Sequence, residues 1–404
     1  MAGGHDWLCG DHAGHLYPHA GKYRGKGKNE GDFVMDALIL SCGTGGGHNS
    51  AGKALLEELD RRGHHVTMLN PYNLKSKKLS RGIDRTYIST VQHMPDAFGA
   101  IYKIGNLYRR LPFRSPVYFV NHGMETVMQE YFEEHPVDIV LMPHLFPAEI
   151  MTNMKLHGRN IPKTMFIATD YACIPFTEET ECDAYVIPLP DLTEEFTAKG
   201  ISKEKLFPLG IPVSSRFSSD QSREQAKKSL GLDTDKKYIL VAGGSMGGGK
   251  IEQTILALSE HFSVKKDVIL LVICGSNQKL YQRLREQVLP GVVLLEHTDV
   301  MEIYMRASHL FITKPGGLSS TEAAVSQVPV IHTAAIPGCE SQNAQYFASH
   351  GMSVWAKTTD EMLHMADLFL ENDEMANNMI GCQRHRIDPD AAAHICDLAE
   401  QLIK

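Results

Sequence analysis

Two short apolar segments, each followed by a glycine-rich turn, constrain the fold of this chain more than any other feature. The first segment is Ala37–Ser41. A glycine-rich turn follows it, and then a helical pattern of apolar residues at Ser50–Gly63. The second is Tyr238–Ala242, followed by the glycine-rich stretch Gly243–Lys250 and a helical pattern at Ile251–His261. A buried strand, a tight turn and a helix in this order open a Rossmann-like unit. Because the pattern occurs twice, the sequence predicts two such units.

Further apolar segments alternate with helical patterns after each of these openings. The strand candidates are Val66–Leu69, Ile139–Met142, Thr164–Ala168, Val186–Ile187 and Leu206–Leu209 in the first half, and Val268–Cys274, Val292–Leu295 and Leu310–Thr313 in the second. One of the intervening helical patterns covers Tyr118–Glu134. Alternating strands and helices are typical of parallel sheets with helices on both faces. We therefore expect an α/β fold with two Rossmann-like domains that face each other across a cleft.

Composition and length divide the chain into four parts. Residues 1–34 are rich in glycine and histidine and carry no periodic apolar pattern, so we expect a disordered extension. A chain of 404 residues is long for one core. We expect the N-terminal domain at residues 35–210 and the C-terminal domain at residues 211–385, with a linker at Gly210–Val213. Residues 386–404 are expected to form a C-terminal helix that crosses back to the first domain.

The overall composition is that of a soluble globular protein, with 43% hydrophobic and 22% charged residues. The formal net charge of −8 argues against a nucleic-acid-binding protein. The cysteines lie far apart and form no CxxC pair, which disfavours a disulfide framework and indicates reduced thiols. No apolar run reaches the roughly 20 residues of a membrane span, and no secretory signal is visible, so we expect a cytoplasmic protein.

One stretch of the chain departs from this acidic balance. Residues 75–115, which we call the basic stretch, carry a net charge of +7 with interleaved aromatic side chains. Such a composition suits an anionic membrane surface, where each basic residue contributes about 1 kcal/mol. A solvated loop or an RNA-binding surface would look the same, but the negative remainder of the chain favours the membrane. The residues expected to face it include Arg109, Arg110 and Arg114.

The turn at Gly243–Lys250 is a candidate phosphate-binding turn. A turn between a strand and a helix presents backbone N–H groups and the positive helix end to an anion. Its sequence, GGSMGGGK, fits neither GxGxxG nor GxxxxGK[ST], which disfavours NAD and the ATP P-loop. The alternative is a turn that binds no ligand.

A second nucleotide signal follows the expected strand Leu310–Thr313. Two glycines and several hydroxyl residues open a helix at Gly316–Thr321, and Glu322 lies one turn into it. The polar turn Ile336–Ala344 opens the next helix. Two helix N-termini beside a carboxylate can bind a diphosphate at the amides and sugar hydroxyls at the carboxylate. Ser319 and Glu322 also have capping-box spacing, so a purely structural role for Glu322 is the alternative.

The N-terminal half has to supply a base if the chain transfers a group to a hydroxyl. His48 follows the first glycine turn at the head of a helix, and a histidine pKa near 6.5 suits proton removal. Asp170 follows a strand, at the edge where open α/β sheets bind ligands. The alternatives are a solvated histidine and an aspartate that caps a turn. His144 is a further strand-end candidate, whereas His64 and His65 are expected on a surface loop.

Two stretches of the sequence resemble a known family. TKPGGLSSTEAAVSQVPVIHTAAIPGCESQNA (residues 313–344) resembles the donor-nucleotide segment of the monogalactosyldiacylglycerol synthases and processive diacylglycerol glucosyltransferases. LSCGTGGGHNSAGKALLEEL (residues 40–59) resembles their first strand, turn and helix. The similarity to this family covers about residues 36–385. The chain also resembles, more distantly, the transferase that makes lipid-linked peptidoglycan precursor. The resemblance implies the GT-B fold, two Rossmann-like domains around a cleft.

The resemblance also implies a binding site for a UDP-sugar in the C-terminal half. The residues that it places along the diphosphate are Gly244, Ser245, Met246 and Gly247 on one side and Gly316, Gly317, Leu318 and Ser319 on the other. It assigns the ribose hydroxyls to Glu322 and the donor sugar to Glu340 and Asn343. Backbone groups near His297 would contact uracil.

On the acceptor side, the resemblance assigns the role of the base to His48. We expect Asp170 to orient His48 or to meet the acceptor hydroxyl, and Gly46 and Gly47 to keep the cleft floor open. Many family members carry a histidine and an aromatic residue a few positions after the aspartate, where this chain has Ile174–Phe176. This departure puts the identity of the acceptor in question.

The resulting expectation is an inverting hexosyltransferase. It would move glucose or galactose from a UDP-sugar to a diacylglycerol-type lipid, making glycoglycerolipid, with no metal cofactor. It would work as a peripheral protein on the inner face of the cell membrane, bind that anionic surface, and bind no nucleic acid. The alternatives are a transferase of the same fold with another lipid or a small hydrophobic acceptor, and a UDP-sugar sensor without turnover.

Overall fold

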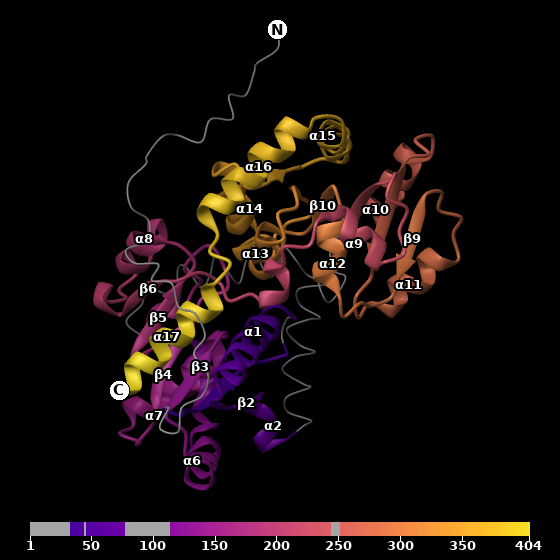
Figure 1. Cartoon of the computed structure of the whole chain (residues 1–404). Coiled ribbons are helices and arrows are strands. Elements are labelled where there is room, and N and C mark those ends of the chain that lie inside the picture. Colours follow the sequence, from indigo (N-terminus) through magenta and orange to yellow (C-terminus); the bar gives the residue numbers. More distant parts are fainter. Residues whose placement is uncertain (1–32, 44–45, 77–113, 244–250) are drawn as a thin grey trace.

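The computed structural model describes residues 33–43, 46–76, 114–243 and 251–404 (Figure 1). These residues form two parallel six-stranded sheets with helices around them. The prediction of an α/β fold with two Rossmann-like units is confirmed. The expectations that lie outside the described residues concern most of the N-terminal extension and Arg109, Arg110, Gly244, Ser245, Met246 and Gly247.

The first sheet has the strand order β2-β1-β3-β4-β5-β6. Its strands are β1 Asp36–Leu40, β2 His65–Leu69, β3 Ile139–Met142, β4 Lys163–Ile167, β5 Ala184–Ile187 and β6 Leu206–Pro208. β1 and β3 pair directly, with Ile39 opposite Leu141. The strand order reverses between them, because β2 lies on one side of β1 and β3 on the other. Open α/β sheets bind ligands beyond the carboxyl ends of the strands at such a reversal.

The second sheet repeats this plan with the order β12-β11-β10-β7-β8-β9. Its strands are β7 Lys237–Ala242, β8 Val268–Ile273, β9 Val292–Leu295, β10 Leu310–Thr313, β11 Val330–His332 and β12 Val354–Trp355. β7 and β10 pair at the reversal, with Ala242 opposite Thr313. The turn after β10, which the sequence predicts to bind the donor, therefore starts at this reversal.

Helices cover both sheets, and apolar strands such as β3 are buried because both of their faces are covered (Figure 1). The first half contains α1 Gly46–Arg62, α2 Tyr72–Lys75, α5 Pro116–His122, α6 Glu125–Glu134, α7 Leu145–Leu156 and α8 Thr193–Ala198. The second half contains α9 Arg223–Ser229, α10 Ile251–Phe262, α11 Gln278–Arg285, α12 Met301–Ala307, α13 Gly317–Val325, α14 Cys339–Ser349, α15 Thr359–Glu371, α16 Asp373–Arg386 and α17 Ala391–Ile403. Among the described helices, none is long and apolar enough to cross a membrane.

The single helix predicted at Tyr118–Glu134 is wrong. α5 ends at His122 and α6 begins at Glu125, with Gly123 and Met124 between them. Glycine is the poorest helix former after proline, and the Met124 side chain is buried in the core. The helix therefore breaks at Gly123, a poor helix former, next to Met124, whose side chain is held in the core.

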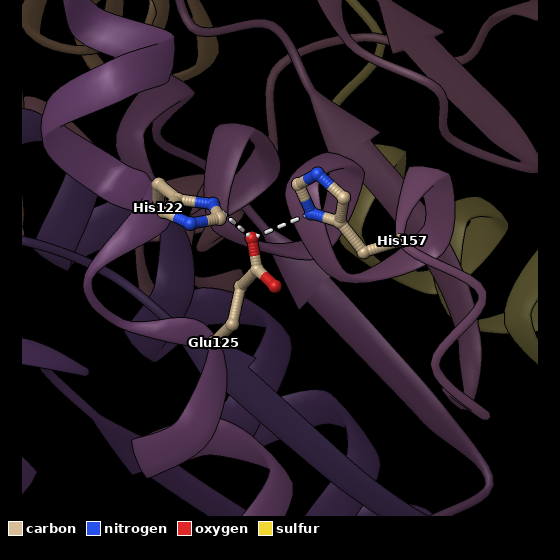
Figure 2. Close-up of side chains that lie close together, drawn as sticks. All are labelled: His122, Glu125 and His157. Atoms are coloured by element: carbon tan, nitrogen blue, oxygen red, sulfur yellow. Dashed lines mark hydrogen bonds and ion pairs between the residues drawn. The ribbon is translucent and has the colours of Figure 1, made fainter.

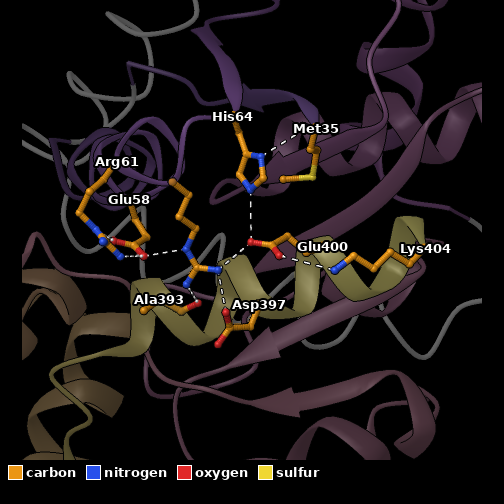
Figure 3. A network of polar contacts seen from close by, with 9 residues as sticks. Met35, Glu58, Arg61, His64, Ala393, Asp397, Glu400 and Lys404 are labelled. Atoms are coloured by element: carbon orange, nitrogen blue, oxygen red, sulfur yellow. Dashed lines mark hydrogen bonds and ion pairs between the residues drawn. The ribbon is translucent and has the colours of Figure 1, made fainter. Parts of the chain in front are cut away.

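The C-terminal helix α17 lies against the first sheet, beside α1 (Figures 1 and 3). Ile395 and Cys396 of α17 are fully buried in the same hydrophobic cluster as Leu55 of α1. Arg62, the last residue of α1, donates through Nη1 to the carboxylates of Asp397 at 2.6 Å and Glu400 at 2.8 Å. Polar and apolar contacts together fix α17 on the N-terminal half.

His64 belongs to this network, and the prediction that it lies on a surface loop is wrong (Figure 3). The side chain is buried; its Nδ1 accepts from the backbone N–H of Met35 at 3.3 Å, and its Nε2 lies 3.2 Å from Glu400 Oε1. The partner carboxylate comes from the far end of the chain. His65, the next residue, is exposed, but it is the first residue of β2 and does not lie on a loop.

Candidate functional site

His48 lies in the first turn of α1, beyond the carboxyl end of β1. Its Nδ1 is 2.7 Å from the carbonyl oxygen of Pro143. Because a carbonyl oxygen only accepts hydrogen bonds, Nδ1 carries the proton and Nε2 carries the lone pair. The hydroxyl of Thr169 lies 3.0 Å from the same Nδ1. The contacts at Nδ1 therefore fix the tautomer that a general base needs.

The electrostatics of His48 and Asp170 are linked. Burial lowers the pKa of His48 below its ordinary value, against the opposing effects of the Asp170 charge and the Pro143 carbonyl. Burial raises the pKa of Asp170, while the Asn343 amide and His48 oppose that rise. The imidazole is therefore neutral at neutral pH and able to take up a proton, and Asp170 favours the imidazolium that results.

His48 and Asp170 line a recess at the carboxyl end of the first sheet. The other lining residues are Pro143, His144, Leu145, Phe166, Ala168, Thr169, Ala172, Ile174, Thr177 and Phe196. A mostly apolar recess with a few convergent polar groups is the usual form of a small-molecule site. It lies where the strand order reverses, since His48 follows β1 and His144 follows the neighbouring β3.

His144 has a structural role in the wall of this recess. Its Nδ1 accepts from the backbone N–H of Phe146 at 3.0 Å and so caps α7. The ring packs edge-on against His48, with 4.5 Å between ring centres. Burial and the neighbouring His48 keep the pKa of His144 well below its ordinary value. His144 is therefore neutral, and the titrating pair of the recess is His48 and Asp170.

The C-terminal half closes against this recess at the start of α13. A Cβ added at Gly317 would lie 2.0 Å from the carbonyl oxygen of Thr169 and 3.2 Å from Asp170 Cα. Only glycine fits so close an approach of two backbones. A Cβ at Gly47 would lie 3.5 Å from Leu318 Cβ, which is an ordinary contact. The N-termini of α1 and α13 therefore meet at the recess.

Asn343 and Tyr171 join the two halves by hydrogen bonds. The Asn343 amide donates to Asp170 Oδ1 at 2.8 Å and to Pro315 O at 3.1 Å, and its oxygen accepts from the Tyr171 N–H at 2.7 Å. The hydroxyl of Tyr171 lies 2.7 Å from Thr321 Oγ1. A residue of the C-terminal half thus holds the carboxylate of Asp170, so the orientation of Asp170 depends on closure of the two halves.

Both halves of the chain match glycosyltransferases. The family described as "Monogalactosyldiacylglycerol (MGDG) synthase" matches residues 48–213, and "Glycosyl transferases group 1" matches residues 222–386. The processive diacylglycerol beta-glucosyltransferase of Staphylococcus carnosus is 25% identical over 348 residues, which cover 85% of this chain and 86% of that protein. Its namesake from Staphylococcus saprophyticus is 32% identical over 272 residues, 63% of this chain and 66% of that protein. The chain is a glycosyltransferase, and its N-terminal half matches the monogalactosyldiacylglycerol synthase family.

Solved structures share the fold of this glycosyltransferase. MurG of Acinetobacter baumannii has a TM-score of 0.58 at 16% identity, over 90% of this chain and 99% of that one. The glycotransferase of kitacinnamycin has a TM-score of 0.62 at 15% identity, over 92% of this chain and 100% of that one. The fold is therefore GT-B, as the resemblance predicted.

The N-termini of α13 and α14 carry most of the described residues that are predicted to contact the donor. α13 begins at Gly317 with Gly316 as its N-cap, so Ser319 lies inside the first turn. The alternative in which Ser319 and Glu322 form a capping box is therefore wrong. Burial raises the pKa of Glu322 to about 8. A carboxyl that is neutral at neutral pH can donate one hydrogen bond and accept others.

The N-terminus of α14 carries Glu340 and Asn343. Glu340 is buried and accepts hydrogen bonds from Lys314 Nζ at 2.6 Å and from the Ile336 N–H at 3.0 Å. Asn343 is the residue that bonds Asp170 at the contact between the two halves. His297 is exposed on the loop between β9 and α12 and lies 3.3 Å from Asp299. The structure thus brings Asn343 to the recess and places His297 on an open surface loop.

The acceptor-side candidates lie on the N-terminal half. Gly46 and Gly47 are the first residues of α1. Arg114, the last arginine of the basic stretch, is half-buried; its Nη1 donates to the carbonyl oxygen of Glu179 at 2.8 Å. Its guanidinium also stacks 4.6 Å from the centre of the Tyr118 ring. Arg114 thereby joins the start of α5 to the loop that follows β4.

Sequence reasoning missed three residues that position the candidate catalytic pair, His48 and Asp170. Thr169 and Tyr171 flank Asp170 beyond β4, and their place at the carboxyl end of a parallel strand was the signal that could have found them. Pro143 contributes a backbone carbonyl to His48. No side-chain pattern encodes such a contact.

Proposed function

We propose that this glycosyltransferase moves glucose or galactose from a UDP-sugar to the hydroxyl of a diacylglycerol-type lipid. The names of the relatives from Staphylococcus carnosus and Staphylococcus saprophyticus support both the lipid and glucose. The observation that carries the mechanism is the bond between His48 Nδ1 and the Pro143 carbonyl, which leaves Nε2 as the base in the recess.

His48 acts as the general base of a single displacement. The acceptor oxygen attacks the anomeric carbon of the sugar as the bond to the phosphate oxygen breaks, and UDP leaves with the electron pair. The acceptor proton passes to His48 Nε2, and Asp170 stabilises the imidazolium. Attack on the face opposite the departing UDP inverts the anomeric configuration and gives a β-glycoside.

Helix N-termini hold the donor in this proposal. The first turns of α13 and α14 direct N–H groups and positive helix ends at the diphosphate, where negative charge grows as UDP departs. Neutral Glu322 takes the ribose hydroxyls, and Glu340 and Asn343 face the donor sugar. Because the helix ends supply positive charge at the diphosphate, transfer in this proposal requires no metal ion.

The lipid acceptor places the enzyme at a membrane surface. The net charge of +7 on the basic stretch supports binding to anionic phospholipid, as a peripheral protein on the inner face of the cell membrane. The net charge of −8 on the whole chain argues against nucleic acid as a partner.

One observation favours another acceptor as the second candidate. Ile174 and Thr177 line the recess, close to where many family members carry a histidine and an aromatic residue. The wall that meets the acceptor therefore differs chemically from that of many relatives. A different lipid or a small hydrophobic acceptor would suit this change.

Incubation with labelled UDP-glucose or UDP-galactose and liposomes that contain diacylglycerol tests the proposal. We expect label in glycosyl-diacylglycerol from at least one donor, and none with liposomes of the same phospholipid without diacylglycerol. Label in a different lipid of a total membrane extract would support the second candidate. UDP binding without transfer to any acceptor would contradict the enzyme and favour a sensor.

A further inference from the structure

Two histidines and a buried glutamate meet at the ends of three helices (Figure 2). His122 is the last residue of α5, Glu125 is the first of α6, and His157 is the C-cap of α7. Glu125 Oε1 lies 2.6 Å from His122 Nδ1 and 2.8 Å from His157 Nδ1. One ligand atom from each residue lies within 4.8 Å of those from the other two.

The carboxylate of this cluster is buried, whereas the imidazoles reach solvent. The Glu125 side chain is 7% exposed, compared with 60% for His122 and 45% for His157. A buried carboxylate requires a compensating positive charge. Two imidazole nitrogens converge on one of its oxygens from separate segments, and an open side faces water.

We propose that His122, Glu125 and His157 bind a divalent transition-metal ion, specifically zinc. Two imidazole nitrogens and one carboxylate oxygen are an established ligand set for Zn²⁺, with water in the fourth position. Tetrahedral zinc holds its ligand atoms roughly 3.3 Å apart, at bond lengths of about 2.0–2.1 Å. The present oxygen–nitrogen spacings of 2.6 and 2.8 Å therefore require outward shifts of about half an ångström. The two imidazole ligand atoms lie within 4.8 Å of each other, and the exposed rings have room to turn to the tetrahedral spacing.

The site lies where the two ends of the basic stretch meet. Lys75, at the end of α2, donates to the carbonyl oxygen of Gly123 at 3.1 Å, and the Tyr72 hydroxyl bonds to Asn121 of α5. α2 precedes residues 77–113 in the chain, and α5 follows them. The ion holds α5 against α6 and α7, and so fixes the position of the helix that follows residues 77–113 in the chain.

The ion takes no part in the transfer of the sugar. α7 runs from its N-cap His144, in the wall of the recess, to its C-cap His157 in the cluster. A helix of 12 residues is about 18 Å long, so this distance separates the ion from the recess. Zinc binding is therefore independent of the proposed function and can be tested without turnover.

Zinc titration of the metal-free full-length chain, against a chromophoric chelator, tests the site. We expect the double variant His122→Ala, His157→Ala to lose one bound Zn²⁺ or to bind it about 100-fold more weakly. Glu125→Gln keeps the shape of the buried side chain and should weaken binding without unfolding the protein. Co²⁺ in place of zinc should give the visible absorption of a four-coordinate ion in the wild type and not in the double variant.

His65→Ala is the matched control, because His65 also lies next to a carboxylate, at 2.9 Å from Asp36, and is exposed in the same half. This variant should bind zinc as the wild type does. The N-terminal histidines His5, His12, His15 and His19 offer competing ligands, so each variant is repeated with these four changed to alanine. Equal zinc stoichiometry and affinity in the wild type and the double variant would overturn the proposal and identify the cluster as an ion pair.

Discussion

Replacing Gly317 with alanine tests how closely the two halves must approach for catalysis. The added Cβ would lie 2.0 Å from the carbonyl oxygen of Thr169, about 1 Å short of the 3.0 Å limit that real Cβ atoms respect. The added Cβ is fixed in place by the backbone of residue 317, and the atom that it meets is a backbone carbonyl oxygen, so neither can rotate away as a flexible side chain would. The two halves must therefore separate by about 1 Å at this point.

The effect on activity follows from this separation. The bond from Asn343 to Asp170, now 2.8 Å, would lengthen to about 3.8 Å and be lost. Overpacking costs about 1–3 kcal/mol, and a displacement of about 1 Å at a reacting centre lowers rates by up to about 100-fold. We expect kcat/KM of G317A to fall about 10- to 100-fold. The thermal midpoint should fall by about a few degrees, the shift that a cost of this size produces in a chain of this length.

The assay is the transfer of labelled sugar to diacylglycerol liposomes, with thermal unfolding measured on the same samples. Gly381→Ala is the matched control, because a Cβ there would meet nothing within 4 Å and the residue lies in α16, outside the proposed donor and acceptor sites. G381A should be as active as the wild type. Equal activity of G317A and G381A would refute the link between closure and the positioning of Asp170.

Three further predictions concern stability and membrane binding. Glu149 of α7 is fully buried, and burial raises its pKa to about 8. Between pH about 4.5 and 8 the carboxyl is ionised in the unfolded chain but protonated in the folded one, so the free energy of unfolding falls as the pH rises through this range. Glu149→Gln should therefore match the wild type in urea unfolding at pH 4 and exceed it by up to a few kcal/mol at pH 9; equal curves at pH 9 would contradict this. Arg62→Ala should cost about 2 kcal/mol in urea unfolding through the loss of its bonds to α17, whereas Arg61→Ala, at an exposed pair, should cost below about 0.5 kcal/mol. Changing Arg109, Arg110 and Arg114 to glutamine should weaken sedimentation with anionic vesicles, and unchanged sedimentation would remove the membrane role of the basic stretch.

The strands were predictable because a parallel sheet is covered on both faces. The predicted strand Ile139–Met142 coincides with β3, since burial on both sides leaves only apolar residues there. The break between α5 and α6 was not predictable from periodicity. The apolar pattern continues across Gly123, and a single glycine is often tolerated within a helix.

Only part of the candidate site could be predicted, because some of its contacts join segments that are distant in the sequence. His48 and Asp170 follow parallel strands, at the edge where open α/β sheets bind ligands, and the family resemblance assigned the role of the base to His48. The contact of Gly317 with Thr169 and the partnership of His64 with Glu400 join segments that are distant in the chain. Such contacts depend on how the halves pack, which residue patterns along the chain do not encode.

Hexose transfer by the His48→Ala variant is the most direct test of His48 as the base. UDP affinity is measured by calorimetry on the same preparation. We expect transfer to fall by about 10²- to 10⁴-fold, the usual contribution of a general base, while UDP affinity stays unchanged because the proposed donor ligands lie in the other half. Transfer at the wild-type rate with intact UDP binding would contradict the mechanism.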